Sequence, residues 1–176
     1  MKILLVITQG DTGGAQMSVL NLARQLIAHG HEVVVGIGPY GDFLPASLSE
    51  LKIQTHRFRW LCRSHNPLVN VAFILQMFGF VKKQGFDAVH FNSSNALCGA
   101  AGVKLANPNI KTVFTFRGLS LLDPNYESSR LKKKIYQTYF NIFLKYIDHK
   151  VFVSHENQQR VQKMVPNGLV IHNGLN

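Results

Sequence analysis

The chain has 176 residues, 46% of them hydrophobic and 16% charged, so it can bury a core without disulfides and is not disordered as a whole. Lysine and arginine number 19 against 9 aspartates and glutamates, and the resulting net charge of +10 favours anionic partners such as phosphates, nucleic acid or an acidic membrane. The two cysteines, Cys62 and Cys98, fit no metal or redox spacing, which excludes a disulfide-rich secreted module and indicates a reducing compartment.

Short apolar runs alternate with longer segments of helical spacing along the chain. Residues 3–7 form the first apolar run, and residues 15–29 carry apolar side chains on one helical face until Gly30 ends the helix. Further strands are expected at 32–37, 53–58, 87–91, 110–116, 149–153 and 169–171, and further helices at 43–51, 67–83, 96–106, 128–147 and 156–165.

This order is a repeated β-α-β unit, which predicts an α/β fold: a Rossmann-like, doubly wound parallel sheet in an α/β/α sandwich. The strands read as continuous apolar runs, as strands buried on both faces do. We expect one domain over residues 1–171, with 172–176 as the start of an interdomain linker. Because ligands of such folds bind beyond the carboxyl ends of the strands, the residues that follow each strand are the candidates for a site.

A glycine-containing loop, Gly10-Asp11-Thr12-Gly13-Gly14-Ala15-Gln16, links the first strand to the first helix. Adjacent glycines let the backbone approach a ligand closely, and a helix N-terminus favours an anion. The spacing matches neither G-x-G-x-x-G nor the P-loop. The loop is therefore either a ligand-binding loop that uses Gly13, Gly14, Ala15 and Gln16, or a tight turn that needs positive φ.

Polar residues crowd the end of the strand at 87–91, where His90 is followed closely by Asn92 and Ser93. His90 can hydrogen-bond a ligand hydroxyl or transfer a proton. The alternative is a half-buried histidine packed under a loop.

Two later strands also end in candidate ligand-binding residues. Arg117 offers a fork of donors suited to phosphate, and Gly118 leaves room for a close approach. The alternative for Arg117 is an ordinary surface arginine. Ser154 precedes a helix, so it is a good N-cap that can also face a ligand. No Ser-His-Asp triad is indicated, because no serine lies in a G-x-S-x-G elbow.

A run of three lysines opens the long helix at 128–147: Lys132, Lys133 and Lys134. We expect Leu131, Ile135 and Ile142 to form the core-facing side of this helix, which aromatic residues widen. The lysines are then either a solvated charge run or a contact with an anionic membrane surface.

Together these residues resemble the N-terminal domain of family 4 glycosyltransferases, the retaining group with the GT-B fold. The resemblance covers the whole chain, and the order and spacing of its motifs make it specific. Its motifs are Gly13-Gly14-Ala15, Phe86-Asp87-Ala88-Val89-His90, Asp148-His149-Lys150-Val151-Phe152-Val153-Ser154 and Val170-Ile171-His172-Asn173-Gly174.

The resemblance implies a transferase that moves a sugar from a nucleotide sugar, as co-substrate, to a lipid-linked or saccharide acceptor with retention, generally without a metal or other cofactor. It implies catalytic roles for His90 and Arg117. The substrate-binding residues that it implies are Gly13, Gly14, Ala15, Gln16, Asn92, Ser93, Gly118, Ser154 and Asn173. It further implies a nucleotide-binding second domain in cis, with a pair of glutamates that this chain lacks, so the chain alone is expected to be inactive.

Two positions depart from the family pattern. Arg117-Gly118 stands where the family usually has His-Gly, and Asn92 stands where it often has a second histidine. Both changes leave the identity of the substrate open. We expect a cytoplasmic protein that can lie peripherally on the cytoplasmic face of the inner membrane.

Three other function classes remain as alternatives. An oxidoreductase nucleotide domain predicts an acidic residue at the end of the second strand, and residues 36–39 contain none. A nucleic-acid binder is suggested by charge alone, without a recognised motif, so we expect no nucleic-acid partner. A sugar-nucleotide epimerase would share the two-domain architecture but fits the motifs less well.

Overall fold

The computed structural model describes residues 1–64, 66–123 and 125–172. Within these residues the strands form one seven-stranded sheet in the order β3-β2-β1-β4-β5-β6-β7, and every neighbouring pair is parallel. The strands are β1 (Lys2–Ile7), β2 (Glu32–Ile37), β3 (Gln54–Arg57), β4 (Ala88–Phe91), β5 (Lys111–Phe116), β6 (His149–Phe152) and β7 (Leu169–Val170). The strand order changes direction between β1 and β4, so the predicted doubly wound parallel sheet is confirmed.

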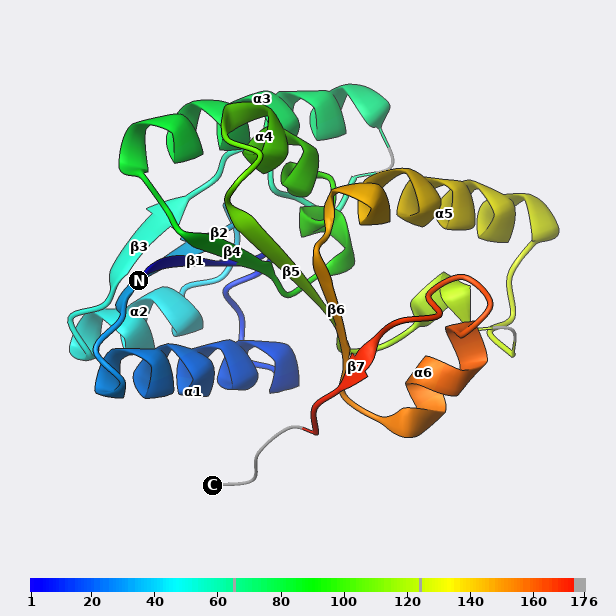
Figure 1. The fold of residues 1–176 in the computed structure, drawn as a ribbon, viewed down its shortest axis with the longest axis horizontal. Helices are drawn as coiled ribbons and strands as arrows, with labels where there is room; N and C mark the ends of the chain where they lie inside the picture. Colours follow the sequence, from blue (N-terminus) through cyan, green and yellow to red (C-terminus); the bar gives the residue numbers. More distant parts are fainter. Residues whose placement is uncertain (65, 124, 173–176) are drawn as a thin grey trace.

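Helices cover both faces of the sheet, which confirms the predicted α/β/α layers. They are α1 (Gly14–Ala28), α2 (Phe43–Glu50), α3 (Pro67–Gln84), α4 (Gly99–Ala106), α5 (Arg130–Phe143) and α6 (His155–Val161), with short 3₁₀ turns η1 (Ser94–Ala96), η2 (Ser120–Leu122) and η3 (Leu144–Tyr146). In Figure 1, α1 and α2 lie on one side of the sheet, and α3, α4 and α5 on the other. Each layer buries its own apolar cluster against its face of the sheet.

The outer face of α5 differs from the sequence prediction. Leu131, Ile135 and Ile142, expected in the core, are 69%, 62% and 47% exposed. The buried side is aromatic instead: Phe140 packs among other rings, and Tyr136 lies 4.9 Å from it between ring centroids. Both sets have helical spacing, and the larger rings bury more apolar area, so they face the sheet.

The helices α3 and α4 approach closely because α4 is built from small residues. A Cβ added to Gly102 would lie 2.3 Å from the carbonyl oxygen of Ile74 on α3. Gly79, also on α3, has no atom within 4 Å of such a Cβ. The glycine at 102 is therefore required by packing, whereas the one at 79 is not.

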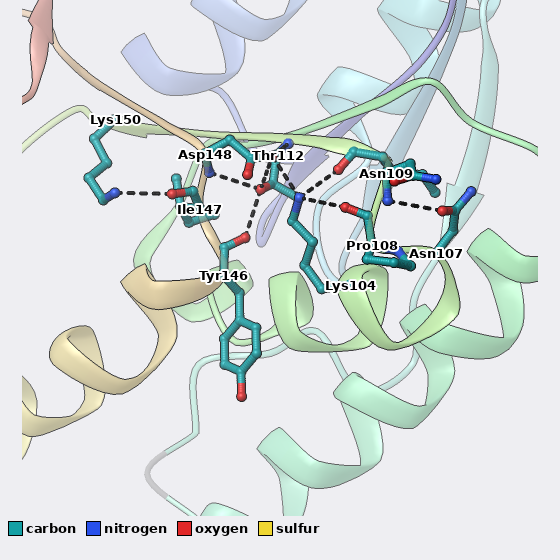
Figure 2. A network of polar contacts seen from close by, with 10 residues as sticks. Lys104, Asn107, Pro108, Asn109, Thr112, Tyr146, Ile147, Asp148 and Lys150 are labelled. Atoms are coloured by element: carbon teal, nitrogen blue, oxygen red, sulfur yellow. Dashed lines mark hydrogen bonds and ion pairs between the residues drawn. The ribbon is translucent and has the colours of Figure 1, made fainter.

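The amino edge of the sheet is held by a polar network around Asp148 and Thr112 (Figure 2). The Asp148 carboxylate accepts from the Thr112 backbone N–H at 2.8 Å and pairs with Lys104 at 2.7 Å. The buried Thr112 hydroxyl donates to the carbonyl of Tyr146 at 2.7 Å. These bonds hold the beginning of β6 beside that of β5, so Asp148 has a structural role far from the carboxyl ends of the strands.

Candidate functional site

A cleft of about 450 Å³ opens at the carboxyl edge of the sheet, where β1, β4 and β5 end. This is the side on which doubly wound sheets bind ligands, next to the change of direction between β1 and β4. Its described lining residues are Ile7, Thr8, Gln9, Ala15, Gln16, Arg63, Asn92, Ser93, Ser94, Asn95, Phe114, Thr115, Phe116, Arg117, Gly118, Ser120 and Tyr136.

The glycine loop has a structural part and an open part. Gly10 is required by packing, because its Cβ would lie 2.4 Å from the carbonyl oxygen of Gly41. Gly13 has φ 177°, an extended conformation that any residue adopts, so the tight turn needing positive φ is wrong for Gly13. A Cβ on Gly14 would meet nothing within 4 Å. The fold therefore does not require glycine at position 14, where the loop leaves open space.

Only the second half of this loop reaches the cleft. Ala15 and Gln16, in the first turn of α1, line it, whereas Gly13 and Gly14 are not among the described lining residues. The Gln16 side-chain amide donates to the carbonyl of Gln9 at 3.1 Å, which fixes Gln16 at the rim.

The ends of β1 and β4 are tied together beside the cleft. The hydroxyls of Thr8 and Ser93 lie 2.6 Å apart, and Ser93 also accepts from the backbone N–H of Thr8 at 3.1 Å. Both residues line the cleft, so its floor is held by bonds between neighbouring strands.

Arg117 and Asn92 form a fixed pair between β5 and β4. The Arg117 Nη2 donates to the Asn92 Oδ1 at 2.7 Å, and the Asn92 amide donates in turn to the carbonyl of His90 at 3.1 Å. Burial lowers the pKa of the Arg117 guanidinium, which nevertheless stays charged at neutral pH. Arg117 is therefore a positioned cation at the cleft, not an ordinary surface arginine.

His90 lies beneath the cleft and does not line it. Its Nε2 is 2.7 Å from the Thr115 hydroxyl, and Thr115 is the residue that lines the floor. Burial, together with the smaller effect of the positive charge of Arg117, lowers the pKa of His90 to about 3. The imidazole is therefore neutral near pH 7, so it is poorly suited to accept a proton there.

The remaining predicted residues lie at different places. Gly118 lines the cleft, and a Cβ there would meet nothing within 4 Å. Ser154 caps α6, accepting from the Asn157 backbone N–H at 3.2 Å, and is not among the described residues that line the cleft. Asn173 lies outside the described residues.

The three lysines lie on α5, away from the cleft lining. Lys132 and Lys134 are exposed, and Lys133 donates to the carbonyl of Asp123 at 3.3 Å. The three lysines therefore lie in the first turns of α5 and do not contribute to the described lining of the cleft.

Sequence reasoning missed Arg63 and Tyr136, which also line the cleft. Arg63 follows β3, and the rule that ligands meet the carboxyl ends of strands could have found it. Tyr136 lies on α5, and no local signal brings it here. Ser120, among the residues expected to follow the strand at 110–116, also lines the cleft. Ser120 has φ +47°, an unusual conformation for a residue with a side chain.

Among the described residues, no three histidine, cysteine, aspartate or glutamate side chains gather as metal ligands do. None of the described helices is both long enough and apolar enough to span a bilayer.

The sequence model of glycosyltransferase family 4 matches residues 12–176, nearly the whole chain. The chain belongs to glycosyltransferase family 4. No curated protein sequence matches this family 4 chain.

Solved glycosyltransferase structures share the fold of this chain. A glycosyltransferase from Rickettsia africae is 24% identical with a TM-score of 0.75, and the alignment covers 99% of this chain and 43% of that one. HepE from Anabaena, solved with UDP and glucose, is 20% identical with a TM-score of 0.73, covering 100% of this chain and 45% of that one. The family 4 chain thus spans less than half the length of these structures.

The fold alone does not select a transferase. A UDP-N-acetylglucosamine 2-epimerase is 11% identical with a TM-score of 0.65, covering 98% of this chain and 47% of that one. The family match, not the likeness in shape, therefore distinguishes this chain from the epimerases.

Proposed function

We propose that this chain is the acceptor-side half of a glycosyltransferase that moves a sugar from a nucleotide sugar to a lipid-linked or saccharide acceptor. The family match carries this proposal, because it extends over residues 12–176. The polar cleft at the carboxyl edge supports it, since it lies where a ligand of this fold would bind.

In the proposed reaction the anomeric carbon loses its bond to the donor phosphate oxygen and gains one to an acceptor hydroxyl oxygen. The hydroxyl proton leaves with the phosphate, and the anomeric configuration is retained. Arg117 faces the cleft as a fixed cation and contacts the donor phosphate or the transferred sugar. His90 acts through Thr115, whose hydroxyl it holds at the floor, and is a positioning residue in this proposal.

The substrate-binding set proposed here follows the cleft. Ala15, Gln16, Asn92, Ser93 and Gly118 line it. Gly14 contributes open space at the loop, which a donor phosphate would enter, whereas a Cβ on Gly13 would lie 2.7 Å from the Gln16 Oε1. Ser154 is assigned to capping of α6.

The test is transfer by a longer protein that contains this chain together with a nucleotide-binding domain. UDP-glucose is the first donor to try, because the similar Anabaena structure holds UDP and glucose. We expect turnover with retention, seen by NMR of the product anomer, and no change when EDTA is added. We expect no turnover by residues 1–176 alone. Inversion at the anomeric carbon would contradict the mechanism, and turnover by the short chain would contradict the need for a second domain.

The same proposal places the protein on an anionic membrane surface at the cytoplasmic face. The exposed Leu131, Ile135 and Ile142 of α5 form an aliphatic stripe, and Lys132 and Lys134 flank it. An aliphatic stripe beside lysines is the arrangement of helices that lie in a membrane interface. It gives α5 an apolar contact and a charge contact on one surface.

Vesicle flotation tests this surface. The protein should float with vesicles of phosphatidylcholine and phosphatidylglycerol more than with phosphatidylcholine alone, and Lys134→Gln should weaken binding about fivefold. Ile135→Ser should also weaken it, whereas Leu105→Ser, which removes an exposed leucine on α4, is the matched control. Equal binding of vesicles by Ile135→Ser and Leu105→Ser would show that α5 does not contact the membrane.

A further inference from the structure

The described lining of the cleft holds two arginines and no carboxylate. Arg63 and Arg117 both line it, and none of its described lining residues is aspartate or glutamate. The described lining is therefore suited to an anion.

The two arginines differ in freedom. Arg117 is tied to Asn92 at 2.7 Å and comes from the end of β5. Arg63 is exposed and comes from the segment between β3 and α3, on another side of the same cleft. One guanidinium is thus held in place, and the other is able to move onto a ligand when it arrives.

His90 lies close to Arg117 but stays neutral near pH 7. Burial and, to a smaller extent, the neighbouring guanidinium lower the pKa of that imidazole, so His90 adds no second positive charge beside Arg117. An anion in the cleft therefore faces fixed positive charge and neutral polar groups, among them Ser94 and Asn95.

We propose that Arg63 and Arg117 together hold a phosphate group of a substrate in this cleft. A guanidinium donates two parallel hydrogen bonds to phosphate oxygens, and a phosphate offers enough oxygens for both arginines and a hydroxyl. An uncharged sugar alone fits less well, because the described lining residues offer its hydroxyl donors no carboxylate acceptors. The inference rests on the proposed function, since the phosphate belongs either to the nucleotide sugar or to a phosphorylated acceptor.

The first measurement is the binding of inorganic pyrophosphate to this chain at low salt, detected by NMR or calorimetry. We expect Arg63→Gln to weaken binding about tenfold, since it removes one charge-assisted contact. The matched control is Arg59→Gln, which removes the same charge from an exposed arginine that lies over Trp60 and outside the lining. Arg117→Lys is the second variant, and it should weaken binding while keeping a cation at the site.

Two further ligands distinguish the sources of the phosphate. Weaker binding of UDP by Arg63→Gln assigns the site to the donor, and weaker binding of a short prenyl phosphate assigns it to the acceptor. Weaker binding of either ligand by Arg63→Gln supports the phosphate site. Absence of pyrophosphate binding by the unaltered chain would overturn it, as would equal losses in Arg63→Gln and Arg59→Gln.

Failure of this site is distinguishable from failure of the proposed function. Sugar transfer by the longer protein that is unaffected by Arg63→Gln, with no pyrophosphate binding, would overturn the site and leave the transferase. Pyrophosphate binding that depends on Arg63, without transfer of any sugar, would keep the site and contradict the transferase.

Discussion

The neutral state of His90 makes the stability of the fold depend on pH. The pKa of this imidazole falls from 6.5 to about 3 on folding, chiefly because of burial and further because of Arg117. Between these two values the unfolded chain binds a proton that the folded chain does not. Stability from this residue is therefore complete above pH 6.5 and is lost as the pH falls toward 3.

The magnitude follows from the difference in proton binding. Between pH 7.5 and pH 5, protonation of the unfolded state at His90 should lower the free energy of unfolding by about 2 kcal/mol. The figure depends little on the folded value, provided that the folded pKa lies below about 4. For a domain of this size the loss corresponds to about 4–8 °C in Tm.

The assay compares the unaltered chain with His90→Gln by urea unfolding at pH 7.5 and pH 5. A glutamine can still hydrogen-bond the Thr115 hydroxyl but does not titrate, so the loss at pH 5 should be about 2 kcal/mol smaller in the variant. His149→Gln controls for removal of a histidine from an exposed position. Equal losses in the unaltered chain and His90→Gln, or an NMR titration of His90 with a midpoint near pH 6.5, would refute the reasoning.

Three further substitutions test the packing and the cleft. Gly102→Ala should destabilise the chain by about 3 kcal/mol or more in urea unfolding, because its Cβ meets the Ile74 carbonyl, whereas Gly79→Ala should stabilise it by about 1 kcal/mol; a stable Gly102→Ala would show that α3 and α4 can separate at little cost. Thr112→Val should cost about 1–3 kcal/mol in the same assay, because the Tyr146 carbonyl loses its donor, and an unchanged midpoint would exclude that role. Gly118→Ala should leave Tm nearly unchanged but lower sugar transfer by the longer protein about tenfold, and unchanged transfer would show that no substrate approaches position 118.

The order of elements could be predicted from the sequence because each strand is a continuous apolar run. Residues 3–7 and 32–37 have no alternative as helices, since they are short, rich in branched residues and bounded by polar or glycine-containing segments. The parallel sheet follows, because helical segments separate the strands. The carboxyl edge then indicates where Asn92 and Arg117 come together, and the structure places both at the cleft.

The orientation of α5 could not be predicted from spacing alone. Two apolar sets share the helix, and the aliphatic one at Leu131, Ile135 and Ile142 has the ordinary spacing of a core face. The sheet beneath it is already aromatic: Phe114 and Phe116 both lie 5.9 Å from Phe140 between ring centroids. Tertiary packing therefore selects the aromatic set, and the aliphatic stripe is left at the surface.

The positions of the charged residues distinguish a phosphate-binding role from a membrane-binding role, which the net charge alone does not. A net charge of +10 is compatible with a nucleic-acid, membrane or phosphate partner. The structure places Arg63 and Arg117 in the cleft and Lys132 and Lys134 on an outer helix, so the two pairs face different surroundings. Arg117 is partly buried, so its contact with a phosphate is screened by salt less than the contact of exposed lysines with a membrane. Raising the salt concentration should therefore release vesicles from α5 at concentrations that still leave pyrophosphate bound in the cleft.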